Sequence, residues 1–296
     1  RSSYPRRKFN NNKIIMKKHK IAAEIFGYPI EHYGFNSNLM KEIKKNGFIS
    51  PFTKKKNKKQ TRLLKIPMGV DSVYWNNVPV IIDPDRFLQD ETIFKDVAKR
   101  FWGSDENVIK LPEVKLKYIG SFDFVLVKHK KLSHEIEDFI ILEIQSDSTT
   151  GTGALVKNLN DLYTKGFNNL ESSYSFGMNT YNTIKLSFIQ MLIKGMVAEK
   201  WDKNVCWVIQ DFIFNNMLNR FDISNNNFDT KKHIHYFIYN MLRKNEKDIF
   251  HLSLDRICSY DILELKKAFD SDRTLPEIDY FVSILKRRIT QQFPKN

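Results

Sequence analysis

The amino-acid sequence predicts an α/β fold with a central mixed sheet flanked by helices. Residues 118–127 alternate their side chains between two faces, as a strand does, and residues 139–142 form an apolar run typical of a strand covered on both faces. Residues 181–200 carry apolar side chains at helical spacing. Because the chain has 296 residues, of which 42% are apolar, it can bury a substantial core.

The first half of the chain contains three further predicted elements. Residues 22–28 favour a short helix that ends at Gly27 and Pro29. Residues 78–82 are typical of a strand, and residues 84–102 predict a helix with a continuous apolar face. These elements precede the two strand-like segments at 118–127 and 139–142.

The second half continues the same alternation. Residues 155–163 predict a helix behind the second of these strands. Residues 205–210 and 236–241 are typical of strands, and 261–269 and 277–293 of helices. Strands and helices thus continue to the end of the sequence.

The charge balance indicates an acidic partner. The chain has 48 Lys and Arg against 34 Asp and Glu, a formal net charge of +14, which favours salt-dependent binding to polyanions. No apolar run approaches the eighteen or so residues that would span a membrane. The two cysteines, Cys206 and Cys258, lie in apolar strand-like segments, as expected in a reducing cytoplasm. Nucleic acid is therefore the expected partner, rather than a membrane.

Two carboxylates stand on strand-like segments that are otherwise apolar. Asp123 shares a face with Val125, and Glu143 shares a face with Gln145 at the end of the next strand. A buried carboxylate is costly unless something neutralises it. In a strongly basic chain, the pair suggests a divalent metal held against a phosphate. The alternative is that these acids are salt-bridge partners or solvated edge residues.

This arrangement of a hairpin with two acids, a helix and further strands resembles the PD-(D/E)xK nucleases. The resemblance implies that Asp123, Glu143 and the carbonyl oxygen of Ile144 bind one or two Mg²⁺ ions. Most members carry lysine at the third motif position. Here that position is Gln145, which can donate a hydrogen bond but brings no charge.

The chain resembles more closely the NotI-type family of type II restriction endonucleases, in which the third position is glutamine. Collinear segments carry this likeness: 23–29 (AEIFGYP), 80–103, 122–123, 142–145 (LEIQ), 184–195 and 251–266. The family implies a homodimeric, Mg²⁺-dependent endonuclease specific for a site in double-stranded DNA. It also implies that Asp123 and Glu143 bind the metal and that Gln145 is the third catalytic residue. The sequence leaves open a PD-(D/E)xK nuclease of repair or junction-resolving type and a non-catalytic nucleic-acid-binding protein.

The resemblance and the charge pattern suggest two parts. Residues 1–75 are expected to form a basic N-terminal arm and DNA-contacting segment, and residues 76–296 the nuclease core. The residues expected to contact nucleic acid are Lys54, Lys55, Lys56, Lys58, Lys59, Arg62 and Lys157. A solvated loop or helix face would account for these lysines equally well.

One departure from the family concerns residues 45–82. Some members carry a four-cysteine metal site in this stretch, whereas this sequence has no cysteine there, so we expect no structural iron or zinc. Apolar side chains are expected to order the segment instead. They are Phe48, Ile49, Phe52, Leu63, Leu64 and Ile66.

Three further residues are candidates near the site. Glu113 could add an accessory carboxylate, although a plain surface acid is the simpler interpretation. Asp147 could face the metal or could begin the loop after the strand. Gln190, on the helix of residues 181–200, is either a buried amide or a partner of the site residues, and the buried amide is the favoured interpretation.

Overall fold

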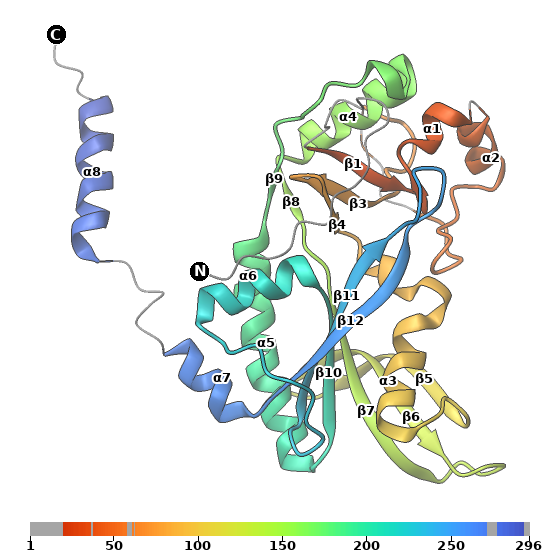
Figure 1. Ribbon diagram of the computed structural model, residues 1–296, viewed down its shortest axis with the longest axis vertical. Helices are drawn as coiled ribbons and strands as arrows, with labels where there is room; N and C mark the ends of the chain where they lie inside the picture. Colours follow the sequence, from red (N-terminus) through yellow and green to blue (C-terminus); the bar gives the residue numbers. More distant parts are fainter. Residues whose placement is uncertain (1–19, 37, 58–60, 62, 271–276, 293–296) are drawn as a thin grey trace.

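The computed structural model describes residues 20–292, except 37, 58–60, 62 and 271–276. In these residues a six-stranded sheet, a four-stranded sheet and a short two-stranded ladder are surrounded by helices (Figure 1). The six-stranded sheet has the order β12-β11-β10-β7-β6-β5. Its strands are β5 (Val108–Leu116), β6 (Gly120–His129), β7 (Ile136–Gln145), β10 (Asn204–Gln210), β11 (Ile234–Leu242) and β12 (His251–Tyr260).

The large sheet is mixed, as the sequence predicts. Strand β10 runs parallel to both β7 and β11, while the pairs β5–β6, β6–β7 and β11–β12 are antiparallel. The four residues 139–142 lie within β7; Phe139 is partly buried and the other three are buried, since β7 has a neighbouring strand on each side and helices over both faces.

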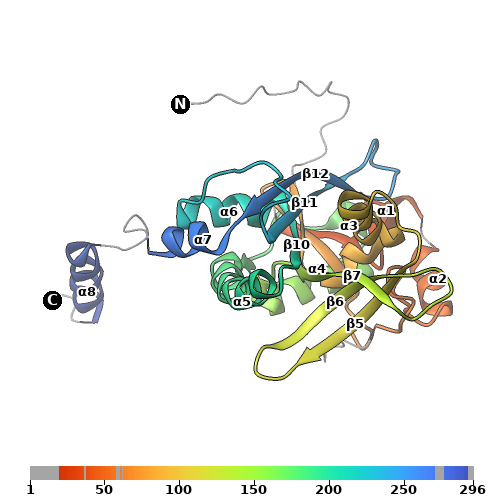
Figure 2. The same ribbon diagram turned by 90° about the horizontal axis from the view of Figure 1, so that it is seen from below.

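Helices cover both faces of this sheet, and Figure 2 shows α3 and α5 on opposite sides of it. One face packs against α5 (Thr180–Trp201), α6 (Asp211–Phe221) and α7 (Ile262–Phe269). The other face packs against the 3₁₀ helix η1 (Pro84–Glu91) and α3 (Thr92–Trp102). Asp123 and Glu143 belong to the α5 face, because their strand neighbours Val125 and Ile141 lie in that core.

The smaller sheet is antiparallel and has the order β2-β1-β3-β4. Its strands are β1 (Lys20–Ile25), β2 (Tyr28–Pro29), β3 (Val70–Trp75) and β4 (Val78–Ile81). Around it lie α1 (His32–Phe35), α2 (Leu39–Lys45), α4 (Thr152–Lys165), η2 (Phe167–Asn169), and the ladder of β8 (Thr149–Thr150) with β9 (Gly177–Met178). The predicted helix at 155–163 is confirmed as part of α4, but its apolar side chains pack in the core of this small sheet and not behind β7.

The predicted helix at 22–28 is wrong. Residues 21–25 belong to β1, are buried, and lie in a strand that pairs with both β2 and β3. Alanine and glutamate favour a helix locally, but an interior strand lets the Glu24 carboxylate meet Arg86 across the core. The tertiary contact overrides the local propensity.

The predicted continuous helix at 84–102 is interrupted. Gln89 is extended, and Asp90 and Glu91 have positive φ angles of 52° and 58°, so η1 and α3 are separate helices. The Gln89 side chain accepts a hydrogen bond from Leu252 N and donates one to Phe250 O, which ties the break to the edge strand β12.

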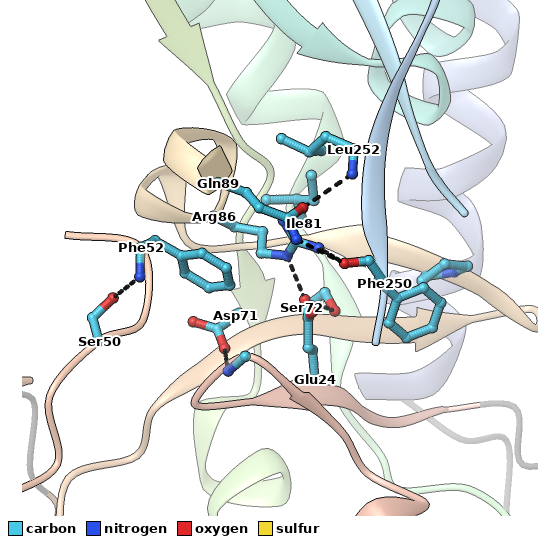
Figure 3. Close-up of polar contacts among 12 residues, drawn as sticks. Glu24, Ser50, Phe52, Asp71, Ser72, Ile81, Arg86, Gln89, Phe250 and Leu252 are labelled. Carbon is cyan, nitrogen blue, oxygen red and sulfur yellow. Dashed lines mark hydrogen bonds and ion pairs between the residues drawn. The ribbon is translucent and has the colours of Figure 1, made fainter. Parts of the chain in front are cut away.

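Arg86 joins the two sheets (Figure 3). Its Nε lies 2.6 Å from Glu24 Oε2 of β1, and its Nη2 donates to Phe250 O beside β12. The Phe52 ring lies 4.8 Å from the guanidinium carbon, a cation–π contact. These contacts fix the small sheet, the segment 48–57 and the edge of the large sheet around one buried cation.

The remaining predicted elements are confirmed within one to three residues as β4, β10, β11, α5, α7 and α8 (Ile278–Gln292). Strands β3 and β5 and helix α6 were not predicted as elements, and the strand-like segment around Cys258 lies in β12. The predicted division between residues 75 and 76 falls in the turn between β3 and β4, which pair with each other. Residues 1–19 lie outside the described residues. No helix of the described residues has the length and apolarity needed to cross a bilayer.

Candidate active site

The two predicted acids meet across the β6–β7 ladder. Phe124 pairs with Leu142, so the residue before it, Asp123, stands opposite Glu143. The Asp123 Oδ2 atom accepts a hydrogen bond of 2.8 Å from the backbone N–H of Ile144, which orients this exposed carboxylate toward the end of β7. Two acids twenty residues apart in sequence therefore lie side by side.

Glu143 is buried, with 4% of its surface exposed. Its Oε2 atom lies 2.6 Å from Lys194 Nζ. Its Oε1 atom is buried and has no hydrogen-bond partner among the described residues. Burial raises the pKa of Glu143 to about 7, against the lowering effect of Lys194, and the nearby charge of Asp123 raises it further.

Gln145 lies two residues beyond Glu143 and on the same face of β7. Its side chain is half-buried, and Nε2 donates a hydrogen bond of 2.7 Å to the carbonyl oxygen of Ser146. This bond ties the carboxamide to the backbone just beyond the end of β7.

Sequence reasoning missed Lys194. This residue of α5 is 6% exposed, and besides its ion pair it donates a hydrogen bond of 2.9 Å to the carbonyl oxygen of Ser121. A signal for it existed, since Lys194 follows Ser187 and Met191 at helical spacing on the buried stripe of α5. A charged residue on that stripe must find an opposite charge beneath it.

Asp147 begins the loop and has a structural role. Its buried carboxylate accepts hydrogen bonds from the hydroxyl groups of Thr180 and Thr183 and from the backbone N–H of Ser148, while its own N–H donates to Ile81 O. It therefore fastens the first turn of α5 and strand β4 to the end of β7. Burial raises the pKa of this carboxyl, and the three hydrogen bonds oppose the rise.

The remaining two candidates are Glu113 and Gln190, and only Glu113 lies next to one of the two acids. Glu113 falls opposite Asp123 on β5, between the pairs Pro112–Phe124 and Val114–Phe122, with an exposed side chain and a φ angle of 53°. Gln190 is exposed, so the expectation of a buried amide is wrong: it lies beside the buried stripe of α5 rather than on it.

The described residues contain no cluster of three or more His, Cys, Asp or Glu side chains that could hold a metal. A metal here would thus depend on two carboxylates and a backbone carbonyl.

The basic segment 54–57 lies near the end of β7. Lys55 and Lys56 line a cavity of about 780 Å³ together with Ser148 and Thr149, which follow β7. Asp71, Asp83 and Asp85 also line this cavity. Lys54, Lys55 and Lys56 are exposed, whereas Lys58, Lys59 and Arg62 lie outside the described residues. Lys157, also predicted to contact nucleic acid, forms ion pairs with Glu171 and Asp161.

The apolar residues between positions 48 and 66, which were expected to order this segment in place of a metal site, are buried only in part. Phe48 and Leu64 pack against the core of the small sheet, and Phe52 covers Arg86. Ile49 and Leu63 are about half exposed, contrary to the expectation. The segment is closed by backbone hydrogen bonds from Ser50 to Lys55 and from Asn57 to Phe48, so it is an ordered turn.

Comparison with protein families identifies the chain. No curated protein matches the chain. The model of the family "Restriction endonuclease NotI" matches residues 68–252, which is more than half of the chain and includes Asp123, Glu143, Gln145 and Lys194. The chain therefore belongs to the NotI restriction endonuclease family and is a type II site-specific deoxyribonuclease.

Proposed function

We propose that the chain is a Mg²⁺-dependent restriction endonuclease with a PD-(D/E)xK core, in which Asp123, Glu143 and Gln145 form the catalytic site. The observation that carries the proposal is the pairing of Asp123 with Glu143 across the β6–β7 ladder. It is supported by Glu143 Oε1, a buried acceptor without a hydrogen-bond partner in the described part of the chain. Such an atom is stabilised by a cation.

The donor set fits a small divalent ion. Carboxylate and carbonyl oxygens are the ligands that Mg²⁺ prefers, and here Asp123, Glu143 and the Ile144 carbonyl would supply them. When bound, the metal would activate a water molecule and neutralise charge on the phosphate. The Ile144 N–H holds the Asp123 carboxylate toward β7, so both acids are oriented before any ligand arrives.

The reaction is hydrolysis of a phosphodiester. A water oxygen attacks phosphorus in line with the 3′ oxygen, the P–O3′ bond breaks, and the products are a 5′-phosphate and a 3′-hydroxyl. Gln145 would hydrogen-bond the water or a phosphate oxygen through its carboxamide. The turn that bears Lys55 and Lys56 lines the same cavity as Ser148, just beyond the end of β7, so its lysines would hold the flanking DNA backbone.

The substrate would be double-stranded DNA with a palindromic site, cut by a homodimer. Two copies related by a twofold axis match the symmetry of a palindrome and place one catalytic site on each strand. Mixing the parental chain with an inactive variant tests this, because mixed dimers would nick one strand. Plasmid that is only linearised, never nicked, would exclude the dimer.

Two substitutions test the catalytic assignment. Asp123→Asn and Glu143→Gln should each slow cleavage by about 10³-fold or more, because each weakens a metal ligand, while DNA binding in EDTA changes little. The assay is gel electrophoresis of a long DNA of diverse sequence incubated with Mg²⁺. Discrete bands support restriction, a smear would indicate a nuclease without site preference, and intact DNA would indicate a binding protein. Near-parental cleavage by either variant refutes the site.

A further inference from the structure

Lys194 places a buried positive charge beside the two acids. Its Nζ atom lies 2.6 Å from Glu143 Oε2, 2.9 Å from Ser121 O and 5.5 Å from the centre of the Phe122 ring. Burying an ammonium group is costly unless it is paired. The two oxygen contacts engage two of its three N–H donors and hold the group in place.

The charge balance of the site indicates a second role for Lys194, in addition to its ion pair with Glu143. When both are ionised, as binding of a metal requires, Asp123 and Glu143 carry two negative charges, Lys194 carries one positive charge, and Gln145 carries none. Addition of a divalent metal would leave one net positive charge in a partly buried site. A phosphodiester carries one negative charge, so its arrival would neutralise the site. Without an anion, the ammonium and the metal would repel each other.

We propose that Lys194 is a catalytic residue whose ammonium group contacts the scissile phosphate and supplies the positive charge that position 145 lacks. This inference rests on the proposed function. The charge reaches the site from helix α5 instead of strand β7. As water attacks, negative charge grows on the non-bridging phosphate oxygens, and the third N–H donor of Lys194 stabilises it. Lys194 remains protonated throughout: the water loses its proton to solvent, and the departing 3′ oxygen gains one.

The proposal is tested by removing the positive charge at position 194 and introducing one at position 145. Lys194→Met should lower the single-turnover cleavage rate by about 10²-fold or more, the usual effect of removing one donor to a developing charge. Gln145→Lys in the otherwise parental chain should lower the rate, because two ammonium groups would then crowd one site. In the Lys194→Met background, the same Gln145→Lys change should raise the rate at least about tenfold. The sign of the Gln145→Lys effect thus reverses.

DNA binding provides a second readout that does not depend on catalysis. In EDTA, the slope of log affinity against log salt should become shallower by about one unit per chain in Lys194→Met, as expected for one lost phosphate contact. Lys185→Met is the matched control, because Lys185 is an exposed lysine of the same helix, and it should change neither slope nor rate. Thermal unfolding of every variant shows whether it is folded.

Two results would overturn the proposal. One is a Lys194→Met rate within about fivefold of the parental rate. The other is a loss of rate that Gln145→Lys does not reverse, since the lysine would then only hold Glu143. If Asp123→Asn also cleaves normally, the proposed function itself fails. If Asp123→Asn is inactive and Lys194→Met is active, only the role of Lys194 is refuted.

Discussion

Arg86 is the residue on which the contact between the two sheets depends most. It is fully buried, and Glu24, Gln89 and Phe250 all contact its guanidinium. Arg86→Met should therefore lower the free energy of unfolding by about 3–5 kcal/mol, because it leaves the Glu24 carboxylate buried and unpaired. Urea denaturation at neutral pH measures the change.

The control is an ion pair of similar length at the surface. Lys130 lies 2.7 Å from Glu135, with more than half of each side chain exposed, so Lys130→Met should cost no more than about 1 kcal/mol. Adding Glu24→Gln to Arg86→Met should restore part of the lost stability, because the uncompensated charge is removed. Equal effects at Arg86 and Lys130 would contradict this account.

His235 makes stability depend on pH. Burial lowers its pKa from 6.5 to about 4, and the neutral ring is held between Ser259 Oγ and Asn204 Oδ1. The unfolded chain therefore binds more protons between pH 6.5 and 4, so the contribution of His235 to stability is lost as the pH falls through that window. Between pH 7.5 and pH 5 the loss should be about 2 kcal/mol.

Buried carboxyls with raised pKa, such as Glu143, act in the opposite direction, so the variant is compared with the parental chain. His235→Gln should remove the acid sensitivity that is due to His235. The measurement is the difference in unfolding free energy between pH 7.5 and 5 for each chain. Parallel pH dependence in both would show that the ring does not titrate as inferred.

The residues of the site differ in how far the sequence reveals them. Asp123 and Glu143 interrupt apolar strand segments, a local pattern that the sequence displays directly. The interpretation of Lys194 requires knowing that α5 lies across the end of β7, a contact between elements about fifty residues apart. Periodicity gives the buried stripe of a helix but not what lies beneath it.

At the scale of elements, Gly195 governs how closely α5 approaches β11. A Cβ atom at this position would lie 2.5 Å from Ile234 Cδ1, so the lack of a side chain at Gly195 permits the close approach. Gly195→Ala should cost about 1–3 kcal/mol through overpacking, despite the better helix propensity of alanine. Chemical denaturation should detect this loss.

Ile234→Val should relieve the overpacking that Gly195→Ala causes, because valine lacks the Cδ1 atom that the added Cβ would meet. The double variant should be at least about 1 kcal/mol more stable than the sum of the two single effects predicts. Additive effects would indicate that the helix shifts as a whole. Since Gly195 follows Lys194, such a shift would also disturb the ion pair with Glu143.

The elements that the sequence mispredicts are those fixed by distant contacts. Residues 21–25 have the composition of a helix but become an interior strand between β2 and β3. The helical pattern of 84–102 is broken where Gln89 bonds to the backbone beside β12, 161 to 163 residues away. In contrast, α5 is predicted almost to the residue, because apolar side chains recur at helical spacing along its 22 residues.

For the whole molecule, the net charge of +14 predicts strongly salt-dependent DNA binding. If the turn of residues 54–57 holds the DNA backbone, Lys55→Gln with Lys56→Gln should make the slope of log affinity against log salt shallower by about two units per chain. Fluorescence anisotropy in EDTA at several salt concentrations measures this slope.

The matched control lies at the opposite end of the β6–β7 hairpin from Asp123. Lys130→Gln with Lys131→Gln removes the same charge from the turn that joins the two strands. This change should leave the slope within about half a unit of the parental value. Equal effects of the two double variants would mean that net charge alone, and not the position of Lys55 and Lys56, sets the binding.

The fastening of α5 by Asp147 has a consequence for how this enzyme can diverge. Thr180 and Thr183 fix the rotational phase of the helix, and Lys194 lies three turns further along. Each residue added between them would turn the ammonium by about 100° around the helix axis and carry it off the sheet. Insertions or deletions between Thr183 and Lys194 should therefore abolish activity.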